Sequence, residues 1–146
     1  MKELFIKGIV LVLILGIPAM VLAQRVVTPE ELKVSPVKYR NSTIKLQDIF
    51  IDTRAGIPPA LTAAGYKLDR YISFGVQKAG MRCFMRRDSV AEKQVMGLKR
   101  GERITIIGTV KQPKMKVKRG ARGQVTDRFK LDIYIIEVSK IIPGWN

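Results

Sequence analysis

The chain has 146 residues, and its 27 lysines and arginines against 12 aspartates and glutamates give a formal net charge of +15. It contains no histidine and a single cysteine, Cys83. These counts exclude a Ser-His-Asp site and an intramolecular disulfide, and they disfavour a zinc hydrolase. The length supports one small domain with one core. The charge favours an anionic partner such as nucleic acid, acidic glycan, lipopolysaccharide or phospholipid headgroups, and a merely basic surface is the alternative.

Residues 1–23 have the pattern of an export signal. Two lysines precede an apolar stretch over residues 8–17, and Val-Leu-Ala before Gln24 forms a small-residue cleavage site. We therefore expect residues 24–146 to form a single domain in the periplasm or outside the cell. The alternative is an uncleaved membrane anchor, but the apolar stretch is shorter than the ~20 residues of a bilayer span and Pro18 interrupts it.

The domain is predicted to begin with a short helix. Thr28 has the position of an N-cap, Pro29 that of the first helical residue, and Glu31 is placed to complete a capping box. Pro36 is expected to end this helix.

Apolar and polar residues alternate in five further segments, which predict five strands. The strands are expected at residues 43–51, 71–77, 81–87, 102–110 and 129–138. Residues 55–67 predict a loop with a short helical turn at 60–64, and Gly108 fits a bulge or a close backbone approach. A helix is predicted over residues 88–98, capped by Asp88 or Ser89. Three groups of residues are expected to face the core: Ile72, Phe74 and Val76; Met81, Cys83 and Met85; and Val90, Val95 and Leu98.

Five strands with a helix between the third and the fourth resemble an OB-fold. Residues 98–110, LKRGERITIIGTV, are similar to the helix end, glycine turn and fourth strand of exported OB-fold domains. Residues 131–142 are similar to their final strand, and residues 38–44 to the start of their first strand. The resemblance covers about residues 35–142 and implies an all-β, five-stranded barrel. An SH3-like barrel is the alternative, and the helix argues against it.

The resemblance implies a binding face on the second and third strands. Alternation places Arg82, Phe84 and Arg86 opposite the core side of the third strand, with Tyr71, Ser73 and Gln77 beside them. An aromatic ring between arginines can stack on a base while the arginines neutralise phosphates. The alternative is that Phe84 points inward or lies under a loop, with the arginines only solvated.

The strongest functional signal is residues 111–130, which contain eight cations and one acid. The cations are Lys111, Lys114, Lys116, Lys118, Arg119, Arg122, Arg128 and Lys130, and the acid is Asp127. In an OB-fold this segment is the loop between strands four and five, next to the binding face. The alternation around Met115 suits an extended ribbon with one charged edge, and a solvated run of charges is the alternative.

No residue pattern supports catalysis. Cys83 is expected in the core, and Asp48 and Asp52 are expected in a solvated loop rather than at a metal site. We therefore predict a non-enzymatic, exported OB-fold binding module without metal or cofactor. Its predicted partner is nucleic acid or another polyanion, such as an acidic glycan or glycolipid. A protein-interaction or structural module of the cell envelope is the alternative. Peripheral contact with an anionic membrane through the basic loop is a third hypothesis.

Overall fold

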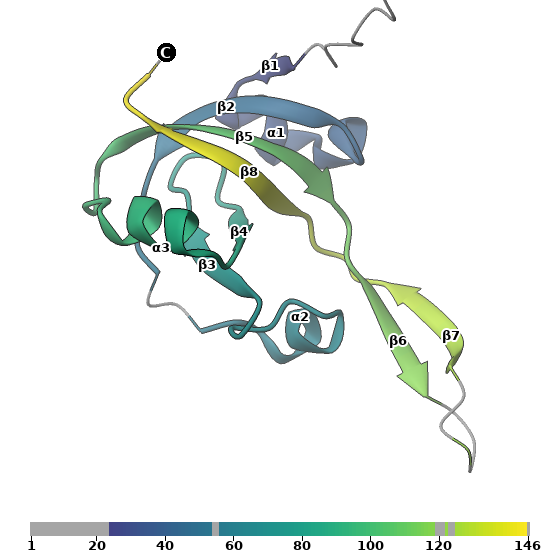
Figure 1. The fold of residues 1–146 in the computed structure, drawn as a ribbon. Helices are drawn as coiled ribbons and strands as arrows, with labels where there is room; N and C mark the ends of the chain where they lie inside the picture. Colours follow the sequence, from purple (N-terminus) through teal and green to yellow (C-terminus); the bar gives the residue numbers. More distant parts are fainter. Residues whose placement is uncertain (1–23, 54–55, 119–121, 123–124, 146) are drawn as a thin grey trace, which may run out of the picture.

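The computed structural model describes residues 24–53, 56–118, 122 and 125–145, and Figure 1 shows their arrangement. The predicted export signal, residues 1–23, lies outside the described residues. In chain order the elements are β1 (Arg25–Val27), α1 (Pro29–Val34), the 3₁₀ helix η1 (Pro36–Tyr39), β2 (Thr43–Ile49), α2 (Pro59–Ala63), β3 (Tyr71–Gly75), β4 (Arg82–Arg86), α3 (Ser89–Met96), β5 (Arg103–Lys111), β6 (Lys114–Lys118), β7 (Val125–Lys130) and β8 (Ile135–Pro143). No helix among these is long and apolar enough to cross a membrane.

The first helix forms as its sequence predicts. Thr28 caps α1 by accepting a hydrogen bond from the Glu31 amide at 3.2 Å, and the Glu31 carboxylate accepts one from the Thr28 amide at 3.3 Å. This reciprocal capping box satisfies two amides that the first helical turn leaves free. The three-residue strand β1, which the sequence analysis did not predict, runs parallel to β2 and places Val27 in the core.

Six strands form one sheet in the order β1-β2-β5-β8-β4-β3, and β6 and β7 form a separate two-stranded sheet. The β4–β8 pair is parallel, whereas the β2–β5, β5–β8 and β3–β4 pairs are antiparallel. Figure 1 shows that the β6–β7 hairpin projects away from the curved main sheet, with α3 and α2 on the side of β3 and β4. The chain therefore consists of a sheet-based body and one extended arm.

The main sheet is open, which corrects the expected closed barrel. Its edge strand β3 meets the end of β2 through a single bridge between Phe50 and Val76, and the Ile51 amide donates to the Gly75 carbonyl at 3.0 Å. Because β2 itself ends at Ile49, too few extended residues remain to build a ladder at this seam.

The main core gathers side chains from the strands of the main sheet, from α1 and from α3. All six residues expected there from the second and third predicted strands are buried, at 9% exposure or less: Ile72, Phe74, Val76, Met81, Cys83 and Met85. The prediction for α3 is partly wrong, because Val90 is 64% exposed, and Ala91 and Val95 are the residues that face inward. The i, i+4 spacing of Ala91 and Val95 forms the buried stripe, and Leu98 packs partly against it.

Gly108 lies at the predicted irregularity. The β5–β8 register shifts between Ile107 and Gly108, and a Cβ atom at Gly108 would lie 2.6 Å from the Glu137 carbonyl oxygen. The side-chain-free residue therefore permits the close approach of the two strands at this bulge.

The predicted final strand, residues 129–138, is in fact two strands that belong to different sheets. β7 ends at Lys130 in the hairpin, and β8 begins at Ile135 in the body. Residues 131–134 carry the chain from one sheet to the other and keep the same alternation of apolar and polar residues. Periodicity alone could not reveal the break, because alternation reports a strand's faces and not its partner.

Candidate functional site

The outer face of β3 and β4, where the sequence analysis placed a binding platform, is covered. Phe84 is fully buried, and the segment that contains α2 lies over it through Leu61 and Tyr66. The ring centroids of Tyr66 and Phe84 are 4.8 Å apart. The prediction that Phe84 is an exposed stacking residue is therefore wrong. The alternative, in which Phe84 lies beneath a loop, is confirmed. The aliphatic and aromatic side chains of residues 57–66 exclude water from this face.

Two polar contacts accompany this cover. The Tyr66 hydroxyl donates to Oε1 of Glu137 at 2.6 Å, and burial, followed by this bond to Glu137, raises the pKa of Tyr66 above its ordinary value. At the other end of the segment, Nη1 of Arg82 donates to the Gly56 carbonyl at 2.7 Å. Arg82 is thus half-buried and engaged within the fold rather than offered to a ligand.

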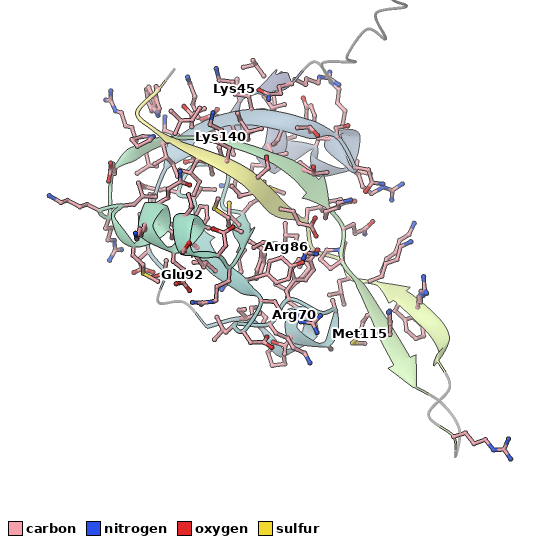
Figure 2. The ribbon with its side chains drawn as sticks, viewed as in Figure 1. Lys45, Arg70, Arg86, Glu92, Met115 and Lys140 are labelled. Atoms are coloured by element: carbon pink, nitrogen blue, oxygen red, sulfur yellow. The ribbon has the colours of Figure 1, made fainter. Side chains whose placement is uncertain are left out.

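The remaining platform residues differ in exposure. Tyr71 is half-buried, and its ring stands perpendicular to Phe84 with the centroids 6.2 Å apart. Arg86 is exposed and is the register partner of Tyr71. Figure 2 shows Arg86 and Arg70 on the body and Met115 on the hairpin. Of the charged residues in the predicted platform, Arg86 remains accessible. This face therefore exposes fewer groups that could bind a ligand than the sequence predicts.

The basic segment forms the β6–β7 hairpin, and its register brings cations face to face. Lys114 pairs with Lys130, and Lys116 pairs with Arg128. All four side chains are exposed. Because residues two apart on a strand point to the same side, these four cations share one face of the ribbon, which we call the cationic face.

The cationic face has a high charge density. The Cβ atoms of neighbouring cationic residues lie roughly 7 Å apart along each strand and roughly 5 Å apart between the two strands. Like charges placed directly opposite destabilise a strand pair. Within the described part of the chain, none of the four cations forms an ion pair with a carboxylate. An anion bound here would relieve this repulsion, so the face is suited to hold negative charge.

Hydrogen bonds at its base join the two sides of the hairpin to each other. The Leu131 amide donates to the Pro113 carbonyl at 2.9 Å, and Nε2 of Gln112 donates to the Leu131 carbonyl at 3.0 Å. These bonds lie where β5 leaves the main sheet and where the chain returns toward β8. They hold the two strands of the arm in register at the point where it leaves the body.

The other predicted loop residues are placed as follows. Lys118 is in β6, with its backbone opposite Val125, and Arg122 is exposed beyond that strand. Arg119 lies outside the described residues. Arg128 and Lys130 were recognised as cations of the segment but not chosen as site residues, because their pairing with Lys116 and Lys114 depends on the hairpin register, which composition does not reveal.

Asp48 has a role that the sequence analysis missed. It was expected in a solvated loop, but it is fully buried at the inner face of β2. Its two carboxylate oxygens accept hydrogen bonds from the Lys78 and Ala79 amides, each at 2.8 Å. The carboxylate therefore fixes the turn between β3 and β4. The signal was available in the strict alternation of β2, which places position 48 on the same side as Ile44 and Leu46.

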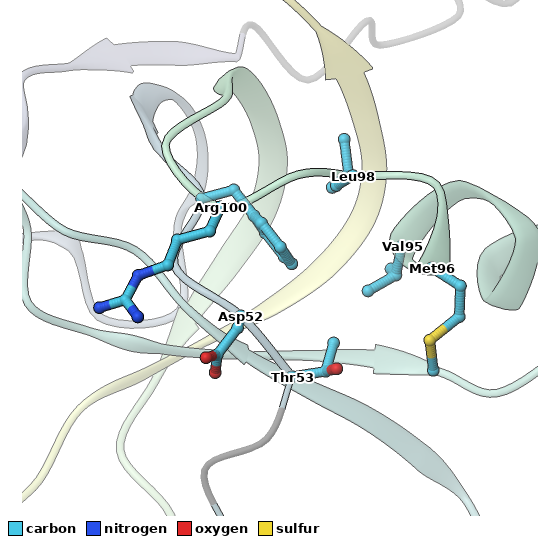
Figure 3. Close-up of a pocket in the computed structure, with 7 residues that line it drawn as sticks. Asp52, Thr53, Val95, Met96, Leu98 and Arg100 are labelled. Carbon is cyan, nitrogen blue, oxygen red and sulfur yellow. The ribbon is translucent and has the colours of Figure 1, made fainter.

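A cavity of about 300 Å³ beside α3 is the competing small-molecule site (Figure 3). Val95, Met96 and Leu98 give it an apolar wall, and Asp52 and Arg100 bring one charge of each sign. Because the carboxylate offsets the guanidinium, the lining of this cavity carries no net charge. No group of three or more Cys, Asp or Glu side chains within the described ranges could hold a metal ion.

Cys83 is a core residue rather than a reactive thiol. It is fully buried, and burial raises the pKa of its thiol, with a further contribution from the negative charge of Asp48. The thiolate, which is the nucleophilic form, is therefore disfavoured in the folded chain.

No protein-family model and no curated protein matches this chain. Among solved structures, it superposes on a protein described as an aspartyl-tRNA synthetase from Leishmania major Friedlin with a TM-score of 0.53 and 9% sequence identity. The fold is OB-like. The match covers 83% of this chain but only 21% of the synthetase, so the OB-like chain spans about a fifth of that protein.

Two further solved structures are similar at lower scores. One is the OBody AM3L09 bound to hen egg-white lysozyme, with a TM-score of 0.42, 14% identity and coverage of 74% of this chain and 88% of the other. The other is apo TiaS, a tRNAIle2 agmatidine synthetase, with a TM-score of 0.35 and 13% identity. This match covers 82% of this chain and 34% of TiaS. At these identities the likeness concerns the fold alone.

Proposed function

We propose that this chain is a non-enzymatic, exported binding module that holds an anionic polymer on the cationic face of its β6–β7 hairpin. One observation carries the proposal: Lys114 faces Lys130 and Lys116 faces Arg128, with all four side chains exposed. A fold stabilised by its own contacts alone would gain from placing acids opposite these cations. The retained repulsion is explained if a polyanion normally neutralises it.

The OB-like fold supports this proposal. Domains of this kind bind oligonucleotides and oligosaccharides beside the loop that corresponds to the β6–β7 hairpin. The solved structure with a TM-score of 0.53 is named for a tRNA substrate. In this chain the segment over Phe84 covers the usual face, so we place the contact on the hairpin, with Arg86 as a neighbouring charge.

A salt titration tests the proposal directly. The purified protein is titrated with fluorescent oligothymidylate, heparin and inorganic polyphosphate at low and moderate salt. We expect binding that weakens steeply as salt rises, because the polymer releases condensed counterions when the four cations replace them. A variant with Lys114, Lys116, Arg128 and Lys130 changed to Gln should lose most of this binding and most of its salt dependence.

The matched control removes the same charge from elsewhere on the surface. Its substitutions are Lys33→Gln, Lys93→Gln, Lys99→Gln and Lys140→Gln, all at exposed positions. If only the total charge matters, both variants will bind equally weakly, and the proposed site is wrong. If the unchanged protein binds none of the three polymers at low salt, the polyanion function itself is wrong.

Protein docking in the cell envelope is the second candidate, and exposed apolar side chains favour it. Val26, Val34 and Val37 near the start of the described chain are 72, 81 and 59% exposed, so they are accessible to a partner. An apolar docking surface would bind its partner with little dependence on salt. Salt-insensitive binding of an envelope protein that is lost when the three valines are changed to Ser would favour this candidate.

Export has its own test. The sequence of residues 1–23 leads us to expect the protein in the periplasmic or secreted fraction, with Gln24 as the new N-terminus. Cell fractionation followed by N-terminal sequencing distinguishes this outcome from a retained anchor, which would leave residue 1 in place and the protein in the membrane fraction.

A further inference from the structure

Phe129 on β7 is an exposed aromatic residue between two cations. Its side chain is 46% exposed, and Arg128 and Lys130 precede and follow it. At Arg82, Phe84 and Arg86 the ring and the two cations share one face of β4, but that ring is fully buried. On the arm the ring and its two neighbouring cations point to opposite faces of β7, and the ring is accessible.

Phe129 has no aromatic partner: none of the ring pairs in the described part of the chain includes it. Its cross-strand partner is Met115, which is half-buried. The two side chains lie on the opposite face of the ribbon from the four cations. Nearly half of Phe129 is exposed on a projecting hairpin, so its ring is accessible to a ligand.

We propose that the polymer bound by the hairpin is single-stranded nucleic acid, with a base stacked on Phe129 and Met115 and the adjacent phosphates on Arg128 and Lys130. This inference rests on the proposed polyanion function and narrows its ligand. The long stems of Arg128 and Lys130 let their charged ends reach the ribbon edge on either side of the ring.

The combination of an accessible ring with neighbouring cations favours one class of polyanion over the others. Single-stranded nucleic acid carries regularly spaced phosphates and unpaired planar bases that can stack on an aromatic side chain. Polyphosphate offers only charge, and heparin offers charge on saturated rings. Because every base has a π-face, we expect stacking here to tolerate any sequence.

The test measures how variants at position 129 bind a polymer with bases and a polymer without bases. We expect Phe129→Ala to lower the affinity for oligothymidylate by about 5- to 150-fold, and the affinity for polyphosphate by less than about twofold. Phe129→Tyr retains the ring and should retain the affinity. Leu68→Ala removes an apolar side chain that is 58% exposed on the body, and it should leave both affinities unchanged.

An abasic oligodeoxynucleotide of the same length completes the experiment. The unchanged protein should bind it about as weakly as Phe129→Ala binds oligothymidylate, because either change removes the stacking of a base on the Phe129 ring.

Equal affinity for the abasic and the thymidine polymer overturns this inference but leaves the polyanion function standing. Absence of binding to oligothymidylate, heparin and polyphosphate alike overturns both. Loss of binding to anionic vesicles in Phe129→Ala, with no change for oligothymidylate, would assign the ring to a membrane and also overturn the inference.

Discussion

The hydroxyl of Tyr66 donates to the carboxylate of Glu137 across 2.6 Å, and this bond joins the segment that contains α2 to the central strand β8. The bond lies beside Phe84, whose ring it helps to keep covered. In many OB-folds this face binds the ligand. Here it forms a small second core made by the chain itself.

Removing that hydroxyl should destabilise the cover. We expect Tyr66→Phe to lower the free energy of unfolding by about 1–3 kcal/mol, because the half-buried Glu137 carboxylate loses a charge-assisted hydrogen bond. Denaturant unfolding measures the change. Tyr71→Phe is the control, since Tyr71 belongs to the same ring cluster but its hydroxyl has no hydrogen bond in the described structure. An equal loss in both variants would contradict a specific role for the Tyr66–Glu137 bond.

Asp48 is expected to contribute strongly to stability. Asp48→Ala leaves the Lys78 and Ala79 amides without an acceptor in a buried site, which should cost about 3 kcal/mol or more. Asp48→Asn retains one acceptor oxygen and should cost less. Asp69→Ala, at an exposed acid, should stay within about 0.5 kcal/mol of the unchanged protein. If Asp48→Ala unfolds like Asp69→Ala in a denaturant titration, the carboxylate does not hold the turn.

A single charge reversal on the hairpin should separate stability from binding. Lys116→Glu turns the repulsive Lys116–Arg128 pair into an attractive one, which should stabilise the hairpin by about 0.2–1 kcal/mol. Hydrogen exchange of the β6 and β7 amides should slow accordingly, while the affinity for polyphosphate falls. Lys140→Glu, which changes the net charge equally on the body, should leave hairpin exchange unaffected. Faster exchange in Lys116→Glu would show that the like-charged pairing is not a source of strain.

The thiol of Cys83 should be inert in the folded protein and titrate only on unfolding. Its pKa is raised by burial, so the folded chain keeps the proton at a pH where the unfolded chain, with a thiol pKa of about 8.5, loses it. The stability from this difference is complete below about pH 8.5 and decreases as pH rises further, by up to about 1.4 kcal/mol per pH unit. Cys83→Ala should remove this part of the pH slope. Rapid labelling by a thiol reagent under native conditions at pH 8 would contradict the prediction.

The sequence predicted most of the elements because their signals are local. The capping box at Thr28 and the alternation from Ile72 to Val76 depend on residues close together in the chain, and both are present in the structure. A helix between the third and the fourth of five predicted strands was sufficient to suggest an OB-like fold, and the helix from Ser89 is present. That the sheet stays open could not be predicted, because closure depends on how far β2 extends beside β3.

The candidate site was predicted less well, since it depends on long-range pairing. Alternation placed Phe84 on the outer face correctly, but outer is not the same as exposed when Tyr66, eighteen residues earlier, folds over it. Asp48 illustrates the reverse: a charge on the inner face is tolerated because three backbone amides donate hydrogen bonds to it there. Composition identified the basic segment, but only the register shows that Lys114 and Lys130 face each other.

The hydrogen bonds of Gln112 and Leu131 close the neck of the hairpin and leave the main sheet without any ladder pairing to β6 or β7. The arm is thus an insertion between two central strands, β5 and β8, and it has a ladder of its own. A change of charge on β6 or β7 therefore leaves the ladders of the main sheet intact.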